Sequence, residues 1–193
     1  MKKIIAVIGD ARVKEDSPRY KMAFSIGKAL VDAGYRIQTG GVHGVMEGAS
    51  KGAHASEKYK EGDVIALLPF FDPSKANEYA DIVIPTGLDV YRNVIVANAS
   101  AVIAIGGGAG TLSELANAWT LKRLIIGVTG LGGWSEKLAG ECLDDRERYA
   151  DLPEDKVFAA KDAEEVVDLL QQYIDKYDAY HTGILTFGGK TKR

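Results

Sequence analysis

The sequence lacks the features that mark secreted and membrane proteins. Its 193 residues contain one cysteine, Cys142, so no disulfide forms within the chain and a reducing compartment is expected. No apolar run approaches the roughly 18 residues that a membrane-spanning helix needs. The first residues are charged like a signal peptide, but the apolar run after them is short and has no small-residue cleavage site. We therefore expect a cytoplasmic protein that does not contact a membrane.

An excess of positive charge is also missing. The chain has 24 lysines and arginines against 27 acidic residues, a net charge of −3. Nucleic-acid-binding domains are usually basic, so no nucleic-acid partner is expected. His43, His54 and His181 show no metal-ligand spacing with one another, with Cys142 or with acidic residues. We therefore expect no metal site.

The chain is rich in glycine, and its 22 glycines fall largely between apolar and amphipathic segments. Apolar runs predict strands at residues 4–8, 35–39, 63–68, 82–84, 101–105 and 124–128, and amphipathic segments predict helices at residues 19–33, 45–57, 89–99, 115–119 and 162–177. Strands alternating with helices indicate an α/β fold with a doubly wound, mostly parallel, Rossmann-like sheet and helices on both faces. We expect one phosphate-binding domain at residues 1–178 and a carboxyl-terminal tail at 179–193.

One glycine-rich turn carries the strongest functional signal. Gly106, Gly107, Gly108 and Gly110, with Thr111, lie between a predicted strand and a predicted helix. The start of a helix offers unpaired N–H groups and the positive end of its dipole, and glycines let a phosphate approach the backbone. The Gly-x-Gly-x-x-Gly and Walker patterns are absent, which disfavours NAD and ATP hydrolysis. The turn predicts a phosphorylated ligand; a tight turn without a ligand is the alternative.

Two further glycine turns follow predicted strands. One contains Gly9, and the other contains Gly40, Gly41 and Gly44. In doubly wound sheets the carboxyl ends of the strands meet at the ligand-binding edge. We therefore expect these four glycines to lie around the same crevice as the later turn, whereas His43 is expected to be a bystander.

Two charged residues are candidates for chemistry. Thr111 and Glu114 form a capping-box pattern, so Glu114 either caps its helix or faces the ligand, where a carboxylate can stabilise a positively charged ribose or act as a base. With Asp89 as the predicted N-cap, Arg92 lies in the first turn of the 89–99 helix, against the dipole. Such a cation needs an anionic partner, either a ligand or Glu114, unless it is simply solvated.

Together these segments resemble the Lonely Guy (LOG) family, long labelled as lysine decarboxylases. That family carries Pro-Gly-Gly-x-Gly-Thr-x-x-Glu, an upstream Arg-Lys pair at a helix start and an earlier glycine-rich turn. The corresponding segments here are residues 105–114, the pair Arg92-Asn93 and residues 40–48, within a resemblance that spans residues 4–128. Gly106 replaces the family's Pro, and Asn93 replaces its Lys.

The resemblance implies a phosphoribohydrolase that cleaves the N-glycosidic bond of a nucleoside 5′-monophosphate of the AMP or cytokinin type. Arg92 and Glu114 would be catalytic, the 106–111 turn would bind phosphate, and we place Asn93 among the ligand-binding residues. The family also implies a homodimer or higher homo-oligomer and no required cofactor. Lysine decarboxylation is not expected, because no lysine is placed for a pyridoxal phosphate Schiff base.

The departures from the LOG pattern indicate a divergent branch, which also resembles the molybdenum cofactor carrier proteins. Those proteins bind a phosphorylated pterin and have no known catalytic activity. The alternative to a hydrolase is therefore a carrier for a phosphorylated ligand.

Overall fold

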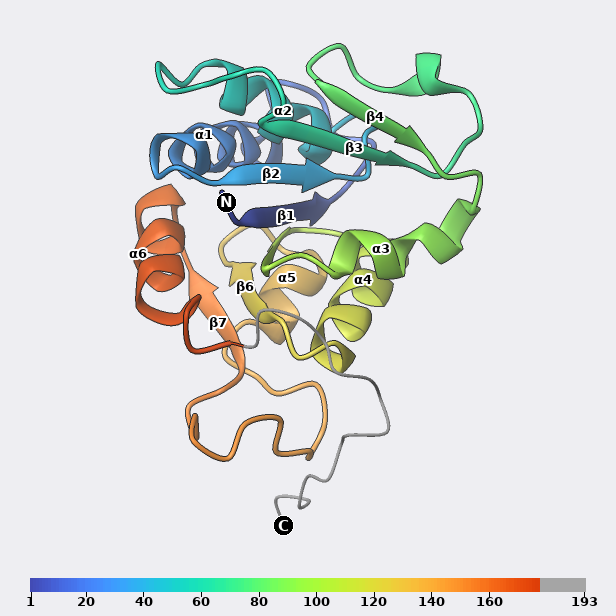
Figure 1. Cartoon of the computed structure of the whole chain (residues 1–193). Coiled ribbons are helices and arrows are strands. Elements are labelled where there is room, and N and C mark those ends of the chain that lie inside the picture. The colour runs from blue at the N-terminus through green and yellow to red at the C-terminus, as the bar shows by residue number, and fades with distance from the viewer. Residues whose placement is uncertain (178–193) are drawn as a thin grey trace.

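Seven parallel strands form the centre of the computed structural model, which describes residues 1–177 (Figure 1). In chain order they are β1 (Ile4–Gly9), β2 (Arg36–Thr39), β3 (Val64–Leu68), β4 (Ile82–Pro85), β5 (Ala101–Ile105), β6 (Leu124–Val128) and β7 (Val157–Ala160). Their order across the sheet is β4-β3-β2-β1-β5-β6-β7. The strands run outward in both directions from β1, so the predicted doubly wound α/β fold is confirmed, and the sheet is parallel throughout.

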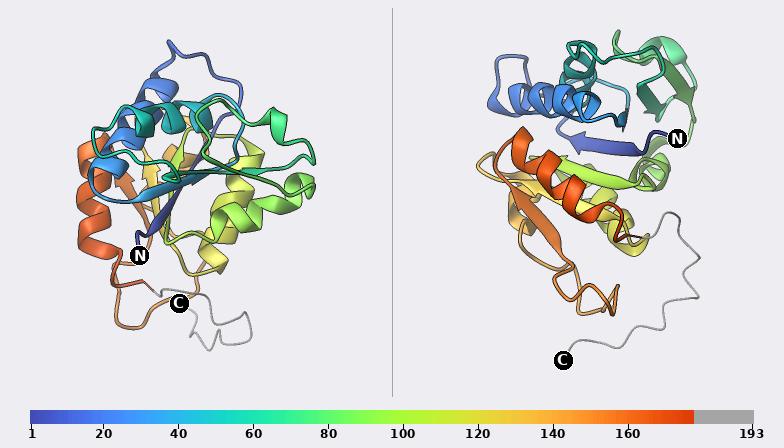
Figure 2. Two further views of the ribbon diagram at one scale, coloured as in Figure 1. Left: turned by 45° about the horizontal axis from the view of Figure 1, so that its top comes forward. Right: turned by 60° about the vertical axis from the view of Figure 1, so that its left-hand side comes forward.

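Helices cover both faces of the sheet (Figure 2). The helices are α1 (Pro18–Asp32), α2 (Val45–His54), α3 (Asn93–Ala97), α4 (Ala109–Thr120), α5 (Gly133–Leu138) and α6 (Ala163–Tyr173), with short 3-10 helices η1 (Pro73–Lys75) and η2 (Asp89–Arg92). One apolar core joins the sheet to α1, α2 and α6, and a second joins it to α3, α4 and α5. Strands β5 and β6 are buried along their whole length, as expected for central strands of a parallel sheet.

Local sequence signals explain several of these boundaries. The Ser17 hydroxyl accepts a hydrogen bond from Tyr20 N–H at the start of α1, and Pro18 occupies the first turn. Asp162 caps α6 in the same way. Gly27 of α1 lies so close to the Ala49 carbonyl of α2 that a side chain there would overlap it. This close approach packs α1 tightly against α2, and the Val45 N–H at the start of α2 donates to the Asp10 carbonyl just after β1.

The structure corrects the predicted helix at residues 89–99. Asp89 has φ of +49°, outside the extended conformation of an N-cap, and it begins the 3-10 helix η2. The α-helix is shorter and starts at Asn93. The predicted helices 45–57 and 162–177 end earlier, at His54 and Tyr173, and the prediction missed α5 and β7.

No helix in residues 1–177 is long and apolar enough to cross a membrane. The predicted tail, residues 179–193, lies outside the described residues.

Candidate functional site

A crevice of about 790 Å³ opens at the carboxyl ends of the central strands. The register pairs Gly9 at the end of β1 with Ile105 at the end of β5, so the turns that follow these strands start at the same level. The crevice is lined by Gly9, Asp10, Ala11, Arg12, Val42, Met46, Arg92, Asn93, Gly108, Ala109, Gly110, Thr111 and Glu114. Residues from each of the three predicted glycine turns line this crevice, but of the four glycines expected from the first two turns only Gly9 does.

The predicted site residues divide into lining and supporting residues. Those that line the crevice are Gly9, Arg92, Asn93, Gly108, Gly110, Thr111 and Glu114. Those that lie outside the lining are Gly40, Gly41, Gly44, Gly106 and Gly107. Gly40 packs against the Arg92 guanidinium so closely that a side chain there would overlap it. These supporting glycines shape the turns and leave room for side chains that do face the crevice. His43, the expected bystander, is exposed and contacts Glu47.

Asp10 connects all three turns, a role that the sequence analysis did not predict. Its carbonyl oxygen accepts the Val45 N–H at 2.9 Å, which joins the first turn to the start of α2. Its carboxylate Oδ2 accepts the Gly107 N–H at 2.8 Å and also pairs with Arg19 Nη1 at 2.8 Å. Gly106 and Gly107 both have positive φ, which this tight turn requires. Asp10 therefore holds the late glycine turn in position from the other side of the crevice.

Residues at the start of α5 form hydrogen bonds with the same glycine turn. The Gly106 N–H donates to the buried Ser135 hydroxyl at 2.8 Å, and the Gly106 carbonyl accepts the Ser135 N–H at 3.0 Å. The Gly107 carbonyl accepts the Trp134 N–H at 3.1 Å. The backbone of the turn is thus fixed before any ligand binds, which lowers the cost of ordering an anion site.

The amino terminus of α4 faces the crevice. Gly108 is its N-cap, and no side chain caps the helix. The first N–H groups of an α-helix have no partner within the helix, and the dipole makes this end positive. A side chain added at Gly108 or Gly110 would meet nothing within 4 Å. The two glycines therefore leave open space directly over a helix terminus suited to a phosphate group.

Arg92 and Glu114 form a buried ion pair at the edge of this space. Arg92 Nη1 donates to Glu114 Oε1 at 2.8 Å, and Glu114 is only 7% exposed. The capping-box interpretation of Glu114 is wrong, because α4 begins at Ala109, so Thr111 lies inside its first turn and the Glu114 carboxylate turns to Arg92 instead. The anionic partner expected for Arg92 is thus Glu114.

The Glu114 carboxyl group of this pair has a raised pKa. Burial raises the pKa of Glu114 from 4.5 to about 7, although the charge and hydrogen bond of Arg92 act in the opposite direction. A carboxyl group with this pKa exchanges protons near neutral pH. Of the Arg92 nitrogens, Nε is buried and has no hydrogen-bond partner among the described residues. Next to the pair, Asn93 Nδ2 reaches the Ser113 hydroxyl at 3.4 Å.

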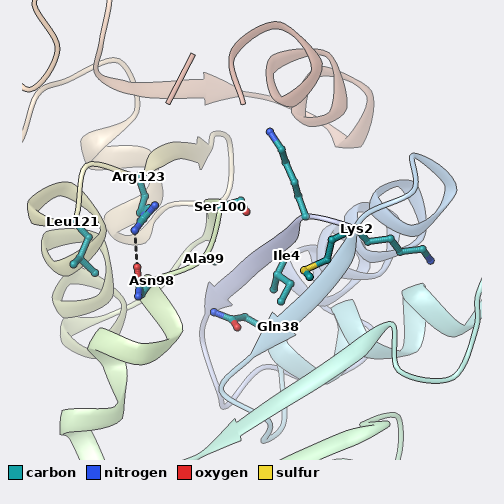
Figure 3. A pocket seen from close by; sticks show the side chains of 10 residues that line it. Lys2, Ile4, Gln38, Asn98, Ala99, Ser100, Leu121 and Arg123 are labelled. Atoms are coloured by element: carbon teal, nitrogen blue, oxygen red, sulfur yellow. Dashed lines mark hydrogen bonds between the residues drawn. The ribbon is translucent and has the colours of Figure 1, made fainter. Parts of the chain in front are cut away.

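A second hollow, of about 510 Å³, lies at the opposite, amino-terminal end of the strands (Figure 3). There Arg123 Nη2 donates to Asn98 Oδ1 at 2.7 Å, and the Gln38 amide donates to the Val96 carbonyl at 2.7 Å. These groups bond to one another or to the backbone, and ligands of such folds bind at the other end of the sheet. The crevice at the carboxyl ends is therefore the candidate site.

The crevice offers an anion-binding helix terminus, a buried cation and a carboxyl group that titrates near neutrality. Within residues 1–177, no three histidine, cysteine or acidic side chains are placed to hold a metal ion. The arrangement is suited to holding a phosphorylated molecule by its phosphate, with Arg92 and Glu114 beside the rest of the ligand.

Comparison with known sequences identifies a family and a relative. The model of the SLOG cluster4 family matches residues 2–167. An uncharacterized protein from Archaeoglobus fulgidus is 41% identical over 115 residues, which are 59% of this chain and 72% of the relative.

Solved structures of similar proteins extend over nearly the whole chain. TM1055, a structural genomics target, is 28% identical with a TM-score of 0.74, covering 88% of this chain and 99% of its own. The molybdenum cofactor binding protein from Rippkaea orientalis is 32% identical with a TM-score of 0.72, covering 90% and 98%. The molybdenum cofactor carrier protein from Chlamydomonas reinhardtii is 29% identical with a TM-score of 0.70, covering 89% and 98%.

Proposed function

We propose that this chain, which belongs to the SLOG cluster4 family, binds a phosphorylated small molecule in the crevice and acts as a carrier or binding protein for it. Molybdenum cofactor, a pterin with a phosphate group, is the ligand suggested by the similar proteins from Rippkaea orientalis and Chlamydomonas reinhardtii. A nucleoside monophosphate has the same phosphate chemistry and is the second ligand class to test.

The observation that carries this proposal is the open, uncapped start of α4. The space over Gly108 and Gly110 admits a phosphate to the free N–H groups, and the turn is already fixed by Asp10 and Ser135. Helix termini of this kind bind phosphate through backbone N–H groups and the dipole. The buried guanidinium of Arg92 adds a positive charge on the same side of the crevice.

The test is a binding titration by calorimetry with molybdenum cofactor under anaerobic conditions, AMP and inorganic phosphate. Gly110→Asp places a carboxylate against the anion site, and Ala116→Asp puts the same charge on an exposed position of the same helix. We expect binding by the wild type and by Ala116→Asp, and its loss in Gly110→Asp. Equal binding by the two variants, or none by the wild type, would refute the proposed phosphate site.

The second candidate is a LOG-like phosphoribohydrolase, and the buried Arg92–Glu114 pair is the observation that favours it. After the phosphate binds at α4, Arg92 would orient the nucleotide and the Glu114 carboxylate would stabilise positive charge on the ribose while water attacks the anomeric carbon. The products would be the free base and ribose 5-phosphate.

This candidate is tested by incubating the protein with nucleoside 5′-monophosphates and measuring free base by chromatography. Glu114→Gln keeps the shape of the side chain and a hydrogen-bond acceptor for Arg92 but removes the carboxylate. Base release that disappears in Glu114→Gln, with ligand binding retained, would support the hydrolase. If the wild type binds the nucleotides but releases no free base, the hydrolase candidate is refuted and the carrier function stands.

A further inference from the structure

Four charged side chains line the crevice, and three of them are held in ion pairs. Arg92 Nη1 lies 2.8 Å from Glu114 Oε1, and Arg19 Nη1 lies 2.8 Å from Asp10 Oδ2. The fourth is Arg12, in the turn that follows β1. Its side chain is exposed and forms no hydrogen bond or ion pair with another of residues 1–177. Within this part of the chain, Arg12 is therefore the cation of the crevice that no carboxylate neutralises.

The acidic residues nearest to Arg12 in the sequence are engaged by other groups. On one side, Asp10 forms the ion pair just described. On the other side, Glu15 Oε2 lies 3.1 Å from Lys51 Nζ, on α2. These contacts leave the Arg12 guanidinium available to an anion that enters the crevice.

The turn that carries Arg12 is fixed beside the start of α4. The Asp10 carboxylate accepts the Gly107 N–H at 2.8 Å, and the Asp10 carbonyl accepts the Val45 N–H at 2.9 Å. Arg12 follows two residues after this anchored position, and Gly107 directly precedes Gly108, the N-cap of α4. Both Arg12 and Gly108 line the crevice, so the free cation and the helix terminus border the same space.

A bound phosphate needs more positive charge than the helix terminus supplies. A phosphate monoester carries about 1.5–2 negative charges at pH 7, whereas a helix amino terminus acts as about half a positive charge. The charge of Arg92 is already offset in part by Glu114. At least about one negative charge of the ligand thus remains to be neutralised, and Arg12 is the crevice residue with a whole charge to give.

The guanidinium group also matches the shape of the ligand. Its planar fork donates two parallel hydrogen bonds to two oxygens of one phosphate. A phosphate monoester has three terminal oxygens, so it can accept the fork and the N–H groups of α4 together. A phosphodiester has two terminal oxygens and a single charge, so it satisfies these donors less well.

We propose that Arg12 folds onto the phosphate bound at α4 and makes the crevice selective for phosphate monoesters over phosphodiesters. This inference rests on the proposed phosphate site and names the ligand class of that site. Before binding, the side chain lies exposed at the crevice. On binding, it contacts the phosphate oxygens that face away from the α4 terminus, so Arg12 determines specificity through the charge and the free oxygens of the ligand.

The experiment is a calorimetric titration of the full chain with AMP and with its 5′-methyl ester, a phosphodiester of the same nucleoside. Arg12→Gln removes the cation from the crevice. Lys14→Gln is the matched control, because Lys14 is an exposed residue of the same turn that does not line the crevice. Neither change removes a packed side chain, and equal urea midpoints would check that both variants are folded.

We expect the wild type and Lys14→Gln to bind AMP equally and more tightly than the methyl ester. Arg12→Gln should bind AMP about tenfold to a hundredfold more weakly, as expected for the loss of hydrogen bonds to a charged group. Its affinity for the methyl ester should fall much less, so the preference for the monoester shrinks. Its AMP binding should also depend less on salt concentration.

The outcomes separate this inference from the proposed function. AMP binding that is lost in Gly110→Asp but unchanged in Arg12→Gln would overturn the role of Arg12 and leave the phosphate site standing. An equal loss in Arg12→Gln and Lys14→Gln, or an unchanged preference for AMP over its methyl ester in Arg12→Gln, would overturn the inference as well. A wild type that binds neither AMP nor inorganic phosphate would refute the phosphate site itself, and the role of Arg12 with it.

Discussion

Replacing Arg92 with alanine should make the stability of this protein depend on pH above neutrality. The change leaves Glu114 7% exposed without its cation, and breaking a buried ion pair costs about 3–5 kcal/mol when the remaining charge stays ionised. Glu114 escapes part of this cost by binding a proton. Its pKa is already raised to about 7 by burial, and both effects of Arg92 lower it, so removing Arg92 raises the pKa further.

The sign and the size of the effect follow from proton linkage. Between the unfolded pKa of 4.5 and the higher folded pKa, the folded protein binds more protons, so the free energy of unfolding falls as pH rises. The fall is at most about 1.4 kcal/mol per pH unit. In the wild type it ends near pH 7, whereas in Arg92→Ala it continues. Between pH 7 and about pH 8.5 the variant should therefore lose up to about 2 kcal/mol more than the wild type.

The assay is urea unfolding of the wild type, Arg92→Ala and the double variant Arg92→Ala/Glu114→Gln across this pH range at constant ionic strength. The double variant has the same missing arginine but no carboxyl group to titrate. We expect a steep fall of the free energy of unfolding in Arg92→Ala and a shallow one in the double variant. Parallel curves for these two variants would refute the reasoning, because the fall would then not come from Glu114.

Three further predictions test the crevice and its support. Gly110→Ala should leave the free energy of unfolding unchanged or raise it by up to about 1 kcal/mol, since a side chain there meets nothing. Gly27→Ala, whose side chain would overlap the Ala49 carbonyl, should lower the free energy of unfolding by about 1–3 kcal/mol. Equal urea midpoints for Gly110→Ala and Gly27→Ala would show that the two expectations cannot both hold. Asp10→Ala removes the acceptor of the Gly107 N–H and should cost about 1.5–3 kcal/mol and weaken AMP or phosphate binding, with Asp10→Asn intermediate in both denaturation and titration.

Most of the fold could be predicted because its signals are local. Runs such as Ala101–Ile105 are apolar throughout, and Gly34 and Asp162 mark helix boundaries. The missed elements have weaker signals: β7 ends in two alanines, and α5 begins with glycines in left-handed conformations. The helical start at Asp89 was wrong because the residue's backbone conformation, which the sequence does not reveal, excludes it from an N-cap.

The candidate site could be predicted in its composition but not in its connections. Glycine turns after strands place Gly9 and Gly108 in one crevice by topology alone. The role of Asp10 depends on contacts with Val45 and Gly107, which are far from it in the sequence, and only the packed turns bring them together. For Glu114 the capping pattern is ambiguous, because moving the N-cap by three residues, from Thr111 to Gly108, changes what the Glu114 carboxylate can reach.

A carrier and a hydrolase place different demands on the protonation of Glu114. Its raised pKa leaves the carboxyl group partly protonated at neutral pH, and a phosphate bound nearby adds negative charge that raises the pKa further. A carrier tolerates the neutral form, since phosphate binding relies on the α4 terminus and Arg92. Stabilising a positively charged ribose requires the carboxylate, so ligand binding itself would suppress the reactive form. We therefore expect the electrostatics of the crevice to favour retention of the ligand over its cleavage.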